Sequence, residues 1–159
     1  MQLHFEHLNL RYNPFGTFEG DKKRKSVVMD VQKYLPFIGE KQTVLFLGEK
    51  GEGKTSHMLG LQRCFPESVY LRLPSYLDPE AFPTIPDAEI LFLDECQRLL
   101  PWQFPFVFRR NRTVIVGSHR NHFYELRLLG WKTHVVRVAQ NDPIKIQCIL
   151  QRKIELSRR

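Results

Sequence analysis

The sequence predicts an α/β protein whose core is a doubly wound, parallel, five-stranded sheet with helices on both faces. Short, continuous apolar runs recur along the chain, as is typical of strands that are buried on both sides. Segments with helix signals separate these runs, and such alternation favours parallel strands joined by right-handed crossovers. Polar residues directly follow three of the runs, at the strand ends where sheets of this class bind ligands.

The order of the expected elements follows from these runs and from the segments between them. An irregular arm at 1–25, with turns at Asn13-Pro14 and Gly16, precedes the first helix. The expected strands are 43–47, 68–73, 90–95, 113–117 and 133–138. The expected helices are 26–38, 54–64, 101–108, 121–129 and a terminal helix that begins at 142.

Capping residues and prolines set the boundaries of these helices. Ser26 suits the N-cap of the first helix, and Pro36 is expected to end it. Pro101 fits the first turn of the third helix, and Gly130 fits the end of the fourth. Asp142-Pro143 supplies an N-cap and a first-turn proline for the terminal helix.

A phosphate-binding loop follows the first strand directly. The run from Gly48 to Thr55 fits the pattern G-x-x-x-x-G-K-S/T, in which backbone N–H groups and a helix N-terminus converge on a polyphosphate. Lys54 would reach the β- and γ-phosphates as a catalytic cation, and Thr55 would bind Mg²⁺. Three glycines would give the loop its left-handed path. The residues predicted to hold the nucleotide are Gly48, Glu49, Lys50, Gly51, Glu52, Gly53, Lys54, Thr55 and Ser56.

Asp94 and Glu95 come after the apolar run of the third strand. Asp94 is suited to holding the shell of the same Mg²⁺ ion, as the metal-binding carboxylate of such sites does. Glu95 is suited to orienting and deprotonating a water that attacks the γ-phosphate, which binding alone does not require. The alternative is that both carboxylates only cap the next helix.

ATP is favoured over GTP as the nucleotide, because the chain contains no Asn-Lys-x-Asp segment of the kind that reads guanine.

Length and composition favour a single domain. The chain has 159 residues, 42% of them hydrophobic, which suffices for one core but not for two. We expect a nucleotide-binding core at 43–140, an N-terminal arm and helix at 1–42, and a C-terminal helix at 141–159. No apolar run approaches the roughly 18 residues of a membrane span and no signal peptide is evident, so we expect a soluble, cytoplasmic protein. The three cysteines form no C-x-x-C pair and indicate neither a disulfide framework nor a zinc site.

These motifs resemble the additional-strand P-loop ATPases, and among them the AAA+ group. The matching pieces are the loop at 48–55, the strand and carboxylates at 90–95, and 118–120 after the fourth strand. The resemblance implies that Ser118 or His119 is the catalytic polar residue called sensor 1. It also implies an arginine finger, for which Arg127 is the candidate. The residues after Val138 suffice for one helix and not for the helical lid of that group, so no lid arginine is assigned.

The arm resembles a segment of the bacterial secretion-type and transposition-helper ATPases. The matching stretch is Tyr12-Asn13-Pro14-Phe15-Gly16. In those ATPases such an arm lies near the adenine. The resemblance therefore implies that Tyr12, Pro14 and Phe15 help to bind the nucleotide.

The charge of the chain indicates a polyanionic partner. The chain has 24 basic and 17 acidic residues, a net charge of +7, and its basic residues cluster at Lys22–Lys25 and Arg109–Arg112. The leading hypothesis is a Mg²⁺-dependent ATPase whose cycle is coupled to a nucleic-acid or protein partner, including another copy of this chain. The alternative is a nucleotide-binding regulatory or scaffold module that does not hydrolyse ATP. A small-molecule kinase is a poorer match, because Glu95 has no necessary role in one.

Overall fold

The computed structural model describes residues 31–74, 84–109 and 112–138, and residues 147, 150, 151, 154 and 155. The chain divides into two compact units, one of them Val31–Gln140 and the other made of Met1–Asp30 with Asn141–Arg159. The five described residues of the second unit are helical, and the rest of the expected terminal helix lies outside the described residues, as does the N-terminal arm. No helix in the described part of the chain is long and apolar enough to cross a bilayer.

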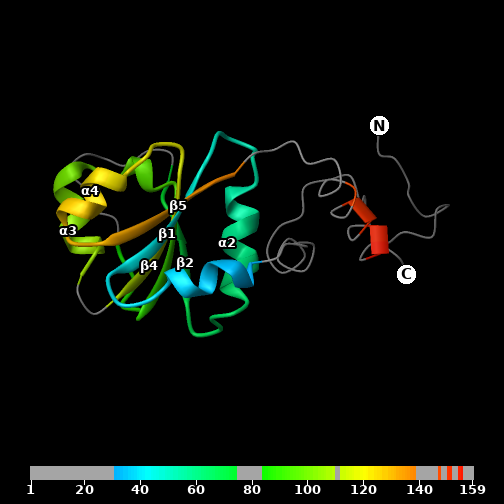
Figure 1. Cartoon of the computed structure of the whole chain (residues 1–159), viewed down its shortest axis with the longest axis horizontal. Helices are drawn as coiled ribbons and strands as arrows, with labels where there is room; N and C mark the ends of the chain where they lie inside the picture. The colour runs from blue at the N-terminus through cyan, green and yellow to red at the C-terminus, as the bar shows by residue number, and fades with distance from the viewer. Residues whose placement is uncertain are drawn as a thin grey trace. The chain divides into compact units, whose positions relative to one another are not determined.

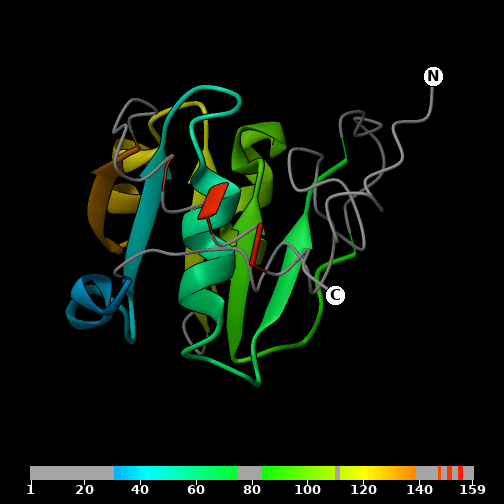
Figure 2. The ribbon, with the colours of Figure 1, turned by 90° about the vertical axis from the view of Figure 1, so that its right-hand side faces the viewer.

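The first unit holds a sheet of five parallel strands, as predicted. Its order is β2-β3-β4-β1-β5, so the strand before the glycine-rich loop at 48–53 lies in the interior with β4 beside it (Figures 1 and 2). The middle positions of β1, β3 and β4 are buried, whereas the edge strands β2 and β5 are only partly covered. The strands are β1 Gln42–Leu47, β2 Val69–Arg72, β3 Ile90–Asp94, β4 Thr113–Ser118 and β5 Lys132–Arg137.

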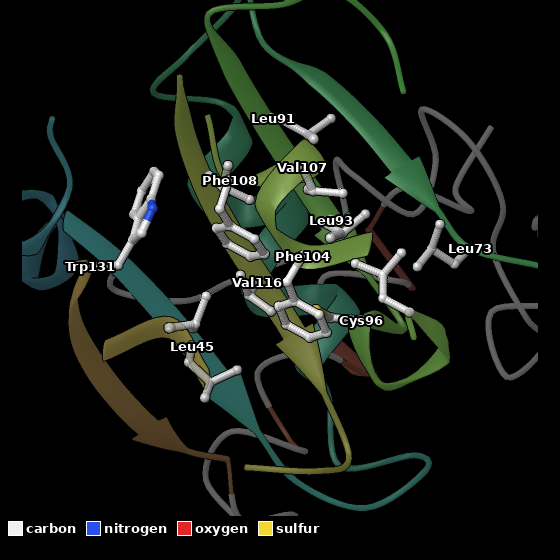
Figure 3. Close-up of a cluster of buried hydrophobic side chains, with 13 residues drawn as sticks. Leu45, Leu73, Leu91, Leu93, Cys96, Phe104, Val107, Phe108, Val116 and Trp131 are labelled. Carbon is white, nitrogen blue, oxygen red and sulfur yellow. The ribbon is translucent and has the colours of Figure 1, made fainter. Parts of the chain in front are cut away.

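Helices cover both faces of the sheet, because alternate residues of each strand point to opposite sides. Figure 1 shows α2 (Lys54–Gln62) on one face, with α3 (Phe104–Val107) and α4 (Phe123–Leu128) on the other. Figure 3 shows the cluster of buried hydrophobic side chains on the face of the sheet that α3 and α4 cover. Its labelled members are Leu45, Leu73, Leu91, Leu93, Cys96, Phe104, Val107, Phe108, Val116 and Trp131. This two-sided burial accounts for the continuous apolar runs in the sequence.

Two of the expected helices differ from the prediction. Within the described part of 26–38 the structure has a 3₁₀ helix, η2 (Gln32–Phe37), and Pro36 lies inside it instead of ending it. A short 3₁₀ segment accommodates proline because it needs few main-chain N–H donors. The helix at 101–108 is divided into η4 (Pro101–Gln103) and α3, since Pro105 cannot donate to a continuous helix and instead opens the first turn of α3.

Candidate functional site

The carboxyl ends of β1, β3 and β4 bring the three polar segments together. The pairing of Leu47 with Ser118 and of Asp94 with Gly117 aligns the ends of these strands. Gly117 has no room for a side chain, because a Cβ there would lie 2.4 Å from Met58 Sδ and 2.8 Å from Asp94 Oδ1. The absence of this side chain lets β4 approach α2 and the Asp94 carboxylate closely.

The loop between β1 and α2 uses its glycines for two different reasons. Gly51 and Gly53 have φ values of 92° and 95°, in the left-handed region that glycine tolerates best. Gly48 was expected to follow the same path, but its φ lies outside that region. A Cβ on Gly48 would instead meet Glu52 Oε2 at 2.4 Å and the Val138 carbonyl oxygen at 2.8 Å. Gly48 is therefore required for close approach.

Lys54 lies at the start of α2 with its ammonium turned back over the loop. Its Nζ donates to the carbonyl oxygens of Gly48 and Glu49, both at 2.8 Å, and lies 3.4 Å from His119 Nδ1. The residue is only 5% exposed. Burial lowers its pKa below the ordinary lysine value, although nearby carboxylates, led by Glu95 and Asp94, oppose this change. The loop thus holds a buried cation over its own carbonyl groups.

The loop backbone already binds an oxyanion from its own sequence. The Glu49 N–H group donates to Glu52 Oε2, and this carboxylate oxygen is the atom that a Cβ on Gly48 would meet. This N–H group of the loop is thus paired with a negatively charged acceptor from the same loop. Lys50 is exposed, and Ser56, in the first turn of α2, is partly buried.

Asp94 is fully buried, and hydroxyl and amide donors surround its carboxylate. Thr55 Oγ1 and the Tyr70 hydroxyl donate to Oδ2, at 2.8 Å and 2.7 Å, and the Glu95 N–H donates to Oδ1 at 3.0 Å. Burial and the Asp94 charge raise the pKa of Tyr70, so its hydroxyl remains a donor. Sequence reasoning missed Tyr70. Its position two residues before the end of β2 was the one signal that could have indicated it.

The oxygen atoms of Thr55 and Asp94 are suitable magnesium ligands. The Thr55 hydroxyl and the Asp94 carboxylate are hard oxygen ligands of the kind that Mg²⁺ prefers. Among the residues that the structure describes, no three His, Cys, Asp or Glu side chains gather as a metal site. Thr55 and Asp94 would supply two oxygen ligands, so an ion held here would take its other ligands from water or from a bound molecule.

Glu95 follows β3 in a strained conformation, with two arginines and a histidine around its carboxylate. Its φ of 65° lies in the left-handed region, which is uncommon for a residue with a side chain. Arg72 Nη2 lies 3.4 Å from Oε1, and Arg98 Nη2 and His119 Nε2 lie 3.4 Å and 3.6 Å from Oε2. Burial alone would raise the pKa of Glu95, but a hydrogen bond from Gln97 and the nearby cations outweigh it and lower the pKa. Glu95 does not cap the 3₁₀ helix η3 (Cys96–Arg98) through its side chain.

Ser118 and His119 occupy different places at the end of β4. Ser118 is fully buried; its Oγ donates to Gln97 Oε1 at 3.1 Å and accepts from the Arg120 N–H at 3.0 Å. The His119 ring lies between the Lys54 ammonium and the Glu95 carboxylate. Its Nδ1 is also 4.0 Å from Glu49 Oε2. His119 therefore faces the site, and Ser118 lies behind it.

Arg112 does not belong to a surface for polyanions, contrary to the prediction for Arg109–Arg112. Its side chain is 7% exposed, and it donates to the carbonyl oxygens of Ala88 at 2.9 Å and Pro86 at 2.7 Å. A further contact at 3.6 Å joins it to Asp87. Burial lowers the pKa of Arg112. This guanidinium holds the turn before β3, because it donates to two main-chain carbonyl groups of that turn.

The other predicted residues divide into exposed ones and ones outside the described part of the chain. Arg109 is exposed, and Arg127 is exposed on α4. The positions outside the described residues are Tyr12, Pro14, Phe15, Lys22–Lys25 and 110–111.

Comparisons with known proteins give a structural likeness only. No protein-family model matches the chain, and no curated protein matches it. A solved structure of PCH-2 from C. elegans matches with 18% sequence identity and a TM-score of 0.43. The match covers 92% of this chain and 48% of that chain, so this chain spans about half the length of the matched protein.

Proposed function

We propose that this protein binds ATP together with Mg²⁺ at the ends of β1, β3 and β4 and hydrolyses it. One observation carries the proposal: a chain of contacts links the phosphate-binding loop to two carboxylates and a histidine from two other strands. Lys54 is 3.4 Å from His119, His119 is 3.6 Å from Glu95, and Thr55 is 2.8 Å from Asp94. A site for binding alone needs the loop and the lysine but no buried carboxylate pair.

The binding roles follow from charge and position. Lys54 would exchange its two carbonyl acceptors for phosphate oxygens, which are stronger acceptors because they are charged. Thr55 and Asp94 would hold Mg²⁺ directly and through water. When bound, the ion supplies positive charge that stabilises the phosphate oxygens during transfer. Tyr70 keeps the Asp94 carboxylate in place through its hydroxyl.

Glu95 and His119 have the roles closest to the reaction. Glu95 is ionised near neutral pH because its neighbours lower its pKa, so it can accept a proton from an attacking water. His119 can donate to Glu95 through Nε2 while Nδ1 faces Lys54. A γ-phosphate that displaced Lys54 from the loop carbonyls would therefore lie beside both groups. Besides this proton transfer to Glu95, catalysis would consist of positioning and charge stabilisation.

A second candidate function is that of a nucleotide-binding module that does not hydrolyse ATP. The observation in its favour is that both oxygens of Glu95 are engaged, Oε1 with Arg72 and Oε2 with Gln97, Arg98 and His119. A carboxylate with this many contacts is a weaker base than an open one. In this case ATP would only stabilise one conformation.

The nucleotide cycle would serve a nucleic-acid or protein partner. The net charge of +7 favours a polyanion, and exposed Arg109 is available for such a contact. Arg112 is excluded from this role by its burial.

Two substitutions test the proposal. Lys54→Ala should abolish ATP binding measured by equilibrium dialysis, because it removes the cation that faces the phosphates. Glu95→Gln should keep ATP affinity within about threefold and lower phosphate release by about 100-fold or more, because the amide keeps the shape and loses the base. The matched controls are Lys132→Ala and Glu67→Gln, at exposed positions on the opposite end of the sheet.

Each outcome separates the candidate functions. Unchanged ATP affinity in Lys54→Ala would reject the site itself. Binding by the wild-type protein without phosphate release, with and without DNA or RNA, would favour the non-hydrolysing module.

A further inference from the structure

Gln97 joins the ends of β3 and β4 through both ends of one amide group. Its Nε2 donates to Glu95 Oε2 at 2.6 Å. Its Oε1 accepts from Ser118 Oγ at 3.1 Å and from the His119 main-chain N–H at 3.2 Å. The residue lies in η3 and is partly buried.

The chemistry of the neighbours fixes the orientation of this amide. An ionised Glu95 carboxylate can only accept, so the NH₂ end of Gln97 must face it. The His119 main-chain N–H can only donate, so the oxygen end must face β4. A flipped amide would place acceptor against acceptor and donor against donor. The arrangement is therefore defined at both ends.

The Glu95 side chain needs such a restraint, because two arginines attract its two carboxylate oxygens from different sides. Arg72 approaches one carboxylate oxygen from β2, and Arg98 approaches the other from η3, both at 3.4 Å. The Arg72 side chain is 58% exposed, and an exposed ion pair of this kind contributes little restraint of its own. The contact of 2.6 Å with Gln97 is shorter than either and belongs to a partly buried group that is itself held by two donors.

We propose that Gln97 is a positioning residue that directs the Glu95 carboxylate toward the end of β4, where the His119 ring faces the loop. This inference rests on the proposed hydrolysis of ATP, in which Glu95 is the base. Gln97 acts through Glu95 and does not touch the nucleotide. Loss of its NH₂ group leaves Glu95 to the arginines, and a displacement of the base by about 1 Å can cost about 100-fold in rate.

Two substitutions of Gln97 separate the two ends of the amide. Gln97→Ala removes both ends. Gln97→Glu has the same length and keeps an acceptor for the His119 N–H, but it cannot donate to Glu95 and places a like charge against it. Gln62→Ala is the matched control, because Gln62, the last residue of α2, is also partly buried and donates to the main-chain carbonyl of Ser68. Thermal unfolding of each variant verifies that it folds.

The first measurement needs no nucleotide. Hydrogen exchange of the His119 main-chain amide, followed by NMR, should be about 10-fold faster in Gln97→Ala than in the wild type, because the amide loses its acceptor. It should be unchanged in Gln97→Glu and in Gln62→Ala. Equal exchange in the wild type and Gln97→Ala would overturn the inference, since the contact with β4 would then not exist in solution.

The second measurement is steady-state ATP hydrolysis. Both Gln97 variants should lower kcat by about 10- to 100-fold with KM within about twofold, because only the placement of the base changes. Turnover equal to that of Gln62→Ala would overturn the inference while the proposed function stands. Absence of turnover in the wild type would reject the proposed hydrolysis. The exchange of the His119 amide alone then decides whether Gln97 contacts β4.

Discussion

At the scale of single residues, the loop satisfies its charged groups from its own backbone. Lys54 is bound to two loop carbonyls, and Glu52 accepts from a loop N–H. In the proposed complex, a polyphosphate would have to replace the Glu52 carboxylate before it could accept from that N–H group. Both groups are negatively charged and would compete for one donor, so the side chain of Glu52 would oppose binding.

Glu52→Gln should therefore raise ATP affinity by about fivefold. A hydrogen bond to a charged acceptor is stronger than one to a neutral acceptor by about 1 kcal/mol, and this difference corresponds to about fivefold in Kd. Isothermal titration with ATP and Mg²⁺ measures the change. Glu49→Gln makes the same charge change in the same loop, but the Glu49 side chain is 85% exposed and contacts no loop N–H in the described structure. Equal gains in both variants would show that only the net charge of the loop matters.

At the scale of elements, α4 is anchored by a buried histidine before its first residue. His122 is 3% exposed, packs against the Phe104 ring of α3 with centroids 5.1 Å apart, and has Nδ1 3.5 Å from Glu125 Oε1. Burial lowers the pKa of His122 below its ordinary value, although Glu125 opposes this change. The folded protein therefore favours the neutral ring.

The free energy of unfolding should consequently decrease as the pH falls below about 6.5, the ordinary histidine pKa. In this window the unfolded chain binds a proton that the folded chain does not, so stability is present above the unfolded pKa and is lost on acidification. His122→Gln should flatten this part of the profile, measured by urea unfolding between pH 5 and about 8. A wild-type profile as steep as that of the variant would contradict the assignment.

At the scale of the whole molecule, the chain has a net charge of +7, and two neighbouring arginines use their charge differently. Arg112 supports the turn at 86–88, whereas Arg109 is exposed three residues earlier. We expect weak, sequence-independent binding to DNA or RNA that falls steeply with salt, because phosphate contacts release counterions. The two arginines provide a test within one segment.

Arg109→Ala should lower the slope of log affinity against log salt by about one, measured by fluorescence anisotropy with a labelled oligonucleotide. Arg112→Ala should leave the slope unchanged and destabilise the fold by about 2 to 4 kcal/mol, because it leaves two main-chain carbonyls without a charged donor. An unaltered slope in Arg109→Ala, or no binding at low salt, would assign the charge to a protein partner.

Much of the fold and part of the candidate site could be predicted from local sequence. The apolar runs predicted all five parallel strands, because burial on both faces makes the interiors of β1, β3 and β4 mostly apolar and the partly covered edge strands still carry several apolar residues. The spacing of glycines and Lys54 identified the loop, since its shape depends on residues that are neighbours in the chain. Pro36 gave a wrong helix end, because a 3₁₀ turn accepts proline, and the helix predicted over 101–108 is divided, because Pro105 lies in the first turn of a new helix.

By itself, the sequence determined the strands, the loop and the polar residues at the strand ends, since these depend on short-range geometry and on burial. Only the tertiary structure decided which side chains meet. It placed His119 in the site and Ser118 behind it, added Tyr70 to Asp94 and Gln97 to Glu95, and turned Arg112 inward. These contacts depend on strand order and register, and a two-sided apolar strand carries no signal for either, because all its interior residues are alike in polarity.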